Sequence, residues 1–272
     1  MGDSVSLSQI HVLFIADIVG KPGYEMAAQY IPAIKKEHAI SLTIANGENS
    51  AEGKGMTPQI AQSLFDIGID VITSGNHIWN KKNLFPVLDQ NPYILRPLNY
   101  PQGCPGHGSC ILEIEKGVHV GVINLQGRSF MYPIDCPFRS MDEEIQRMQE
   151  RNVQTIVLDF HAEATAEKIA MGWYLDGRVS AVIGTHSHVQ TADERILPKG
   201  TAYITDAGMT GAFDSVIGMD KNSAIQRFLT QLPIPYKIAY DDPKCCGVIV
   251  SMDQNSGKAN SISRFQISLS QT

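Results

Sequence analysis

The feature that most constrains this chain is a repeated alternation of short, almost wholly apolar runs with segments of helical character. Strands that are apolar on both faces are typical of sheets covered on both sides, and their alternation with helices indicates an α/β architecture. The runs that predict such strands are residues 10–16, 40–45, 70–73, 155–160, 180–184 and 201–205. Between them we expect helices over residues 22–38 and 58–67, each with a proline near its first turn.

Two further regions break this alternation. Residues 109–125 predict two strands around a turn at Lys116 and Gly117, and residues 235–269 predict strands with a turn near 255–257. The fold is therefore not a purely parallel sheet. We expect two mixed sheets packed together with helices outside. A chain of 272 residues is long enough for a full core, and we expect one domain that spans residues 1–272.

The charge balance excludes one class of partner. The chain has 22 Lys and Arg against 28 Asp and Glu, which is a formal net charge of −6. A mildly acidic chain is not expected to bind long nucleic acid through the nucleic acid's backbone charge. A small phosphate ligand remains compatible, because one bound metal ion outweighs several distant carboxylates.

Cysteine usage and hydropathy predict a location. The five cysteines are odd in number and include no CxxC spacing, which predicts a reduced, cytoplasmic protein. No apolar run approaches the length of a membrane span, and the first run contains His11 and leads into Asp17, so we expect neither a membrane segment nor a signal peptide. Residues 1–6 fit the loose N-myristoylation pattern, which we interpret as a chance match in a disordered N-terminus.

Polar residues follow five of the predicted strands, and they share an ability to bind metal ions. They are Asp17, Asn46, Glu48, Asn49, Asn76, His77, His161, His186 and His188. Each alone has an ordinary interpretation as a helix cap, a turn residue or a structural histidine. Ligands in α/β proteins bind outside the carboxyl ends of strands, so we expect these side chains to converge. Their recurrence on separate strands predicts a metal site.

The composition of this set indicates the chemistry. Carboxylate, amide and imidazole groups without thiolate suit Mn, Fe or Zn and do not suit a structural zinc knot. There are more donors than one ion requires, which favours a pair of ions bridged by Glu48. Paired ions are the standard arrangement for hydrolysing phosphate esters, because they generate a hydroxide from a shared water and neutralise phosphoryl charge.

Eight sequence blocks strengthen this hypothesis. In chain order they are FIADIVGKPG (14–23), NGEN (46–49), SGNHIW (74–79), LRPLNYP (95–101), NLQGRSFM (124–131), DFHAEATAEK (159–168), GTHSHVQTAD (184–193) and TDAGMTG (205–211). Together they resemble the YmdB branch of the calcineurin-like metallophosphoesterases. Val19 replaces the histidine of the general superfamily's first block, and Glu48 with Asn49 replaces its bridging aspartate. Both departures match the YmdB branch, whereas Ala16 and Asn80 differ from it without removing a ligand.

The resemblance implies a fold, an activity and cofactors. The fold is a four-layer αββα sandwich, and the activity is hydrolysis of 2′,3′-cyclic AMP and GMP to 3′-nucleotides. The cofactors are two metal ions, with iron as the native metal and manganese as a substitute. Attack by the metal-bridging hydroxide is assisted by His77, which protonates the leaving ribose oxygen. The implied ligands are Asp17, Glu48, Asn49 and His188 for the first ion and Glu48, Asn76, His161 and His186 for the second.

Several alternatives remain open at this point. The enzyme could be a phosphatase or diesterase of another substrate, such as a phosphoprotein or a short RNA end, and the protein could instead sense a nucleotide without hydrolysing it. An amidohydrolase is less favoured, because that fold carries its HxH motif on the first barrel strand and not near residue 186. His77 could orient Asn76 instead of donating a proton.

Other residues have equally open roles. Arg96 and Arg128 lie in family-like loops and would either clamp phosphate or form surface ion pairs. The loop at 206–211 would line a base pocket, with Met209 either touching the base or packing in the core. For assembly, we expect a homo-oligomer.

Overall fold

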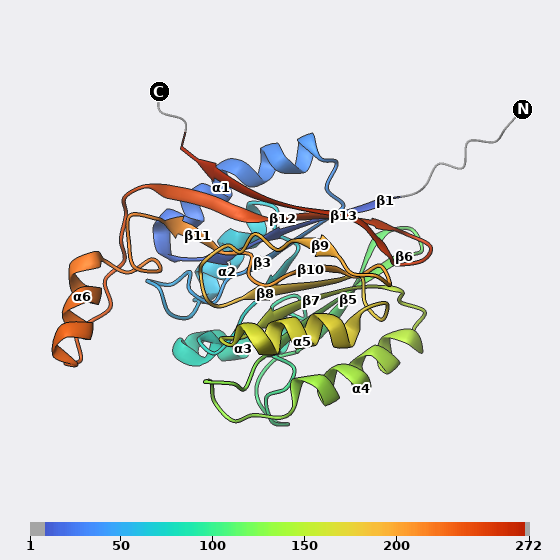
Figure 1. The fold of residues 1–272 in the computed structure, drawn as a ribbon, viewed down its shortest axis with the longest axis horizontal. Helices are drawn as coiled ribbons and strands as arrows, with labels where there is room; N and C mark the ends of the chain where they lie inside the picture. The colour runs from blue at the N-terminus through green and yellow to red at the C-terminus, as the bar shows by residue number, and fades with distance from the viewer. Residues whose placement is uncertain (1–8, 270–272) are drawn as a thin grey trace, which may run out of the picture.

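The computed structural model describes residues 9–269, in which two mixed sheets pack face to face between helices (Figure 1). The first sheet has the order β2 (Asp17–Ile18), β11 (Met209–Ala212), β12 (Pro243–Asp253), β1 (Gln9–Ile15), β3 (Leu42–Asn46) and β4 (Val71–Thr73), with β13 (Ala259–Ser268) paired to β12. The second has the order β5 (Ser109–Glu115), β6 (Val118–Gln126), β7 (Thr155–His161), β8 (Ala181–Thr185), β10 (Ala202–Ile204) and β9 (Arg195–Ile196). The N-terminal hexapeptide, for which disorder is expected, lies outside the described residues.

Helices cover the outer face of each sheet. Those packed on the first sheet are α1 (Gly20–Glu37), α2 (Pro58–Asp66) and α3 (Phe85–Gln90), the last preceded by the short turns η1 (Ile78–Asn80) and η2 (Lys82–Leu84). Those packed on the second sheet are α4 (Pro137–Gln149) and α5 (Thr165–Leu175). The remaining helix, α6 (Lys221–Thr230), projects from the body of the molecule at one end (Figure 1). These layers confirm the expected αββα sandwich.

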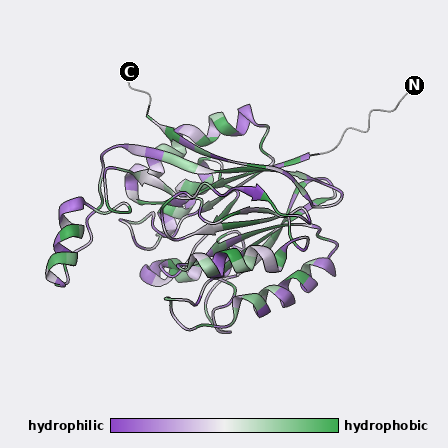
Figure 2. Cartoon of the chain, in the orientation of Figure 1, coloured by the Kyte–Doolittle hydropathy of each residue, from purple (hydrophilic) through white to green (hydrophobic). Residues whose placement is uncertain are grey.

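Strand alternation explains why the runs are apolar throughout. In β1, Ile10, Val12 and Phe14 belong to the core between the sheets, whereas Leu13 and Ile15 pack against the helices of the first sheet. Successive side chains of a strand point to opposite faces, so both faces of β1 are buried. Each such side chain contributes roughly 1.5–3 kcal/mol on burial. Figure 2 shows the resulting pattern, with hydrophobic residues along the strands and hydrophilic residues on the outer turns of the helices.

Most predicted elements are confirmed, and one is wrong. The Thr57 hydroxyl caps α2 by accepting a hydrogen bond from the Ile60 amide at 3.3 Å, as its position before Pro58 predicts. Residues 235–242 form no regular strand, and β12 begins only at Pro243. Prolines lack the amide donor that a strand needs, and Pro235 at the start of this segment, with Pro233 just before it, disfavours a strand here. Within residues 9–269 no helix has both the length and the hydropathy to cross a bilayer.

We predict that the packing protects three of the five cysteines. Burial raises the pKa of Cys110 and Cys245 to about 12 and that of Cys246 to about 11. At pH 8 each is therefore about one thousandth thiolate or less, and thiolate is the reactive form. A colorimetric thiol reagent should label Cys104 and Cys136 in the native protein and all five in denaturant. Rapid native labelling of a third cysteine would contradict this packing.

Candidate metal centre

The layer between the sheets changes from apolar to polar at the carboxyl ends of the parallel strands. Asp159 and His161 occupy the inward face at the end of β7, and Thr185 ends β8 beside them. Across the interface, Asn46 and Thr73 end β3 and β4. All five side chains are fully buried. Parallel strands that end at the same edge therefore bring polar groups from both sheets together.

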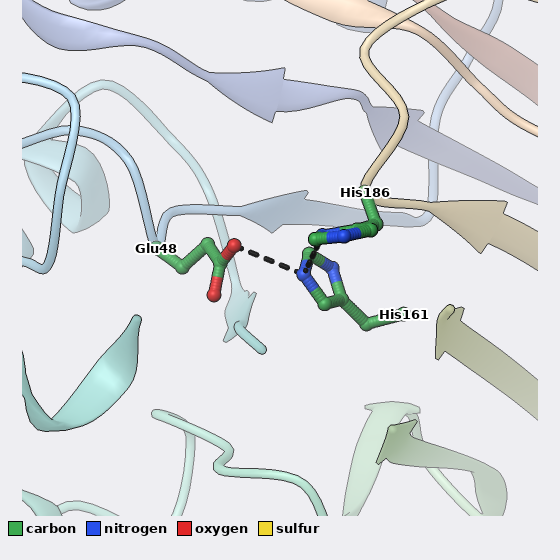
Figure 3. A group of neighbouring side chains, drawn as sticks. All are labelled: Glu48, His161 and His186. Atoms are coloured by element: carbon green, nitrogen blue, oxygen red, sulfur yellow. Dashed lines mark hydrogen bonds and ion pairs between the residues drawn. The ribbon is translucent and has the colours of Figure 1, made fainter. Parts of the chain in front are cut away.

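Three predicted ligands form the centre of this region (Figure 3). Glu48 follows β3, His161 ends β7 and His186 follows β8, and their ligand atoms all lie within 4.8 Å of one another. A Glu48 carboxylate oxygen lies 2.9 Å from Nε2 of His161, and that nitrogen lies 3.0 Å from Nδ1 of His186. The amide of His77 donates to the other Glu48 oxygen at 2.8 Å.

Three more predicted ligands carry an unsatisfied side-chain oxygen. Asp17 Oδ1, Asn49 Oδ1 and Asn76 Oδ1 are buried and have no hydrogen-bond partner. In two of these residues the other polar atom of the side chain forms a hydrogen bond. Asp17 Oδ2 accepts from the His186 amide at 3.2 Å, and the Asn49 side-chain nitrogen donates to the Gly53 carbonyl at 3.0 Å. A buried oxygen without a partner is costly, and a cation beside it removes that cost. The residues therefore fit the metal ions that the family implies.

His188 and His77 lie at the rim of the centre. Both line a cavity of about 450 Å³ that also reaches Glu48, Asn49 and His186. Nδ1 of His188 contacts the Ile217 carbonyl at 3.0 Å, which leaves Nε2 for a ligand. His186 and His188 have φ angles of 99° and 64°, a left-handed conformation that is strained for histidine and common at functional sites. All the predicted site residues thus lie around one centre, whose tight cluster is Glu48, His161 and His186.

The buried charges perturb one another strongly. Burial raises the pKa of Asp17 well above its usual value, with further contributions from Asp206 and Glu48. Burial opposes the ionised forms of Glu48 and His161 as well, but their mutual attraction outweighs it, so the pKa of Glu48 is lowered and that of His161 is raised. Burial and then the His161 charge lower the pKa of His186 to about 3. Metal ligands must be deprotonated. A cation that binds His161 would therefore displace the proton that Glu48 stabilises on this imidazole.

Asp159 is a buried residue beside this centre that sequence reasoning missed. Its carboxylate accepts hydrogen bonds from the hydroxyls of Thr73 at 2.5 Å and Thr185 at 2.6 Å and from the Asn46 amide at 3.1 Å. Because the Thr185 hydroxyl donates its proton to Asp159, its oxygen accepts a hydrogen bond from Nδ1 of His161 at 2.9 Å. His161 is thereby held with Nε2 facing Glu48 and His186 at the centre. Its one signal in the sequence is its position two residues before His161, on the same face of the strand.

A buried ion pair holds the turn between the paired histidines. Lys168 lies 2.7 Å from Asp206, and the side chains are 2% and 1% exposed. Asp206 also accepts from the Ser187 amide at 3.0 Å and the Ser187 hydroxyl at 2.7 Å. The loop that begins at Asp206 therefore anchors the histidine turn, and Met209 within it is buried in β11. On the outer side, Glu163 lies 3.0 Å from Nε2 of His186, so Nδ1 is the nitrogen that faces the centre.

The two candidate arginines do not reach the centre. The Arg96 guanidinium donates to the Pro97 carbonyl at 2.8 Å and to the Leu98 carbonyl at 3.2 Å, so it braces its own loop. Arg128 is exposed, and its backbone amide donates to Glu167 at 3.0 Å. Neither residue forms an ion pair in the described part of the chain.

Comparison with known proteins identifies the family of this chain. The YmdB-like protein family matches residues 13–265. This chain belongs to that family. The YmdB-like chain is 50% identical to the 2′,3′-cyclic-nucleotide 2′-phosphodiesterase of Bacillus subtilis (strain 168) over 258 residues, which cover 95% of this chain and 97% of the relative. The predicted family resemblance is confirmed.

Solved structures agree with the fold. A hypothetical protein from Thermus thermophilus is 39% identical and superposes with a TM-score of 0.89, covering 95% of this chain and 99% of that one. A protein described as a novel phosphatase from Mycoplasma pneumoniae is 33% identical with a TM-score of 0.90, covering 96% of this chain and 94% of that one. The YmdB-like chain thus shares this arrangement with both proteins over nearly its whole length.

We predict that Gly75→Ala weakens metal binding. A Cβ at this position would lie 2.1 Å from Cδ2 and 2.3 Å from Nε2 of His161, so the imidazole must move. Displacing a ligand in this way should lower the affinity for Mn²⁺ about ten- to hundredfold, as measured by titration calorimetry. Gly211→Ala is the control, because its added methyl would come no closer than 3.2 Å to another atom. Unchanged affinity in Gly75→Ala would argue against His161 as a ligand.

We predict that Lys168→Met destabilises the fold, because it leaves Asp206 buried without its cation. The free energy of unfolding in urea should fall by about 3–5 kcal/mol. Lys221→Met removes an exposed ion pair with Asp214 and should leave the unfolding midpoint almost unchanged. Equal losses in the two variants would mean that the buried pair is not what holds the histidine turn.

Proposed function

We propose that this protein is a dinuclear-metal phosphodiesterase that hydrolyses cyclic nucleotides, with 2′,3′-cyclic AMP and GMP converted to 3′-nucleotides. The observation that carries the proposal is the set of buried oxygens without a hydrogen-bond partner, on Asp17, Asn49 and Asn76, around the cluster of Glu48, His161 and His186. Such a set suits two cations better than one. The printed activity of the Bacillus subtilis relative supports the choice of substrate.

The donor atoms divide into two groups that share Glu48. The proposed ligands are Asp17, Glu48, Asn49 and His188 for one ion and Glu48, Asn76, His161 and His186 for the other. Oxygen and imidazole donors without thiolate suit iron, with manganese as a substitute. When bound, such ions lower the pKa of a shared water and neutralise charge on the phosphate.

His77 is placed to act as the general acid. It lines the cavity of about 450 Å³ beside the proposed ligands, and its amide is tied to Glu48. Its Nδ1 lies 3.1 Å from the Asn80 oxygen, so in the imidazolium this nitrogen donates to Asn80 and Nε2 carries the proton for the leaving ribose oxygen. The side-chain amide at position 80 thus orients the ring. A positioned acid of this kind contributes roughly 10²–10⁴-fold to the rate.

A second candidate is a phosphatase with a different physiological substrate. It is favoured by the solved Mycoplasma pneumoniae relative, which is described as a novel phosphatase. The two candidates share the metal centre and differ in what fills the cavity, so they predict different ratios of activity towards cyclic diesters and monoesters.

The test is hydrolysis of 2′,3′-cyclic AMP by metal-reconstituted protein, with the products separated by chromatography. We expect 3′-AMP, and we expect His77→Ala to lower kcat by roughly 10²–10⁴-fold with two ions per chain retained. His119→Ala, which alters an exposed histidine on β6, is the matched control. Turnover of phosphomonoesters alone would favour the phosphatase. Tight nucleotide binding without turnover, in protein that holds two ions per chain, would favour a sensor.

A further inference from the structure

A second pocket adjoins the metal centre. It has a volume of about 350 Å³ and shares only His186 with the first cavity. Asn76, another proposed ligand, also lines it. The rest of its wall is the segment Phe130, Met131, Tyr132 and Pro133. The metal centre therefore opens onto two distinct spaces.

The wall of the second pocket presents bare aromatic rings. Phe130 is 92% exposed and Tyr132 is 74% exposed, so neither ring packs against the body of the protein. Phe130 also has a φ angle of 62°, a strained backbone conformation for a residue with a side chain. Exposed aromatic rings beside a binding site are platforms on which nucleobases stack, and strained backbone is common at such sites.

The segment that carries these rings is anchored at both ends. At its start, the Gly127 amide donates to the His161 carbonyl at 3.0 Å, and the Ser129 amide donates to Glu167 at 3.0 Å. At its end, the Asp135 amide donates to the Asn99 carbonyl at 3.2 Å. The anchors tie the segment to a proposed ligand on one side and to the body of the protein on the other. The backbone that carries the two rings is thus fixed beside the metal centre.

The first cavity also has aromatic walls beyond its metal ligands. Phe228 and Tyr236 line it together with the cationic side chains of Lys54 and Arg227. Phe228 is 75% exposed on the projecting helix α6. A cyclic nucleotide carries one nucleoside, since both of its ester oxygens belong to the same ribose, and it occupies one of these pockets. A linear diester of two nucleosides carries one nucleoside on each ester oxygen, so it requires two such pockets.

We propose that the enzyme also cleaves short linear oligonucleotides, and that Phe130 and Tyr132 bind the base of the nucleotide that keeps the phosphate. This rests on the proposed phosphodiesterase function. Water adds to phosphorus, its oxygen stays on the phosphate, and the bond from phosphorus to the leaving nucleoside oxygen breaks. His77 lines the first cavity, so the leaving nucleoside lies there and takes its proton from His77. The products are one nucleoside and one nucleotide monoester.

The experiment compares two substrates on the manganese-loaded enzyme. They are adenylyl-(3′,5′)-adenosine and 2′,3′-cyclic AMP, with kcat and KM measured for each by chromatography. In Phe130→Ala/Tyr132→Ala we expect kcat/KM for the dinucleotide to fall about ten- to hundredfold, mostly through KM, because a stacking platform is lost. The same variant should change kcat/KM for 2′,3′-cyclic AMP by less than about twofold, because that substrate uses the first cavity. Tyr93→Ala is the matched control, since Tyr93 is 39% exposed and lines neither pocket.

Each other outcome overturns a specific statement. If the wild-type enzyme cleaves the cyclic nucleotide but not the dinucleotide, the second subsite is wrong and the proposed function stands. If the double variant lowers kcat/KM equally for both substrates, or leaves kcat/KM unchanged for both, the two rings do not bind a base. If the wild-type enzyme cleaves neither substrate, the proposed function itself fails. A thermal melt of each variant shows whether it is folded.

Discussion

The contact between Glu48 and His161 joins the two halves of the molecule. Glu48 follows a strand of the first sheet, His161 ends a strand of the second, and their side chains are 1% and 0% exposed. Asp159 strengthens the same junction, because it accepts hydrogen bonds from Asn46 and Thr73 across the sheet interface. At this end polar contacts join the two sheets, whereas apolar side chains pack in the rest of the interface.

Such a junction is costly unless its groups are paired. Buried carboxylates and imidazoles lose their hydration, and only good partners compensate for that loss. Glu48 and His161 pair with each other, and Asp159 is satisfied by three donors, but Asp17, Asn49 and Asn76 each retain an oxygen without a partner. The molecule therefore concentrates its unsatisfied polarity at one place. A metal centre would satisfy these oxygens, and it agrees with the family to which the chain belongs.

The rigid layers and the irregular segments have different roles around this centre. Strand ends and short turns position the proposed ligands, and the ion pair of Lys168 with Asp206 keeps the strained turn of His186 and His188 in place. The exposed rings beside the two pockets come from the projecting helix α6 and from the segment at Phe130. The proposed metal ligands are thus held by the core, while the pocket walls are formed by segments that can vary without disturbing it.

The sequence by itself determined the strands, the sandwich and the candidate set of metal-binding side chains, because apolar runs and the polar residues at their ends are local patterns. It could not distinguish Asp159 from the apolar strand around it, nor reveal that Asp206 anchors the histidine turn, because those roles depend on partners 113 and 19 residues away. It also misplaced a strand at 235–242, where Pro235 and the preceding Pro233 outweigh the apolar pattern. Only the tertiary structure decided which side chains meet, because packing two sheets brings together groups whose separation along the chain carries no local signal.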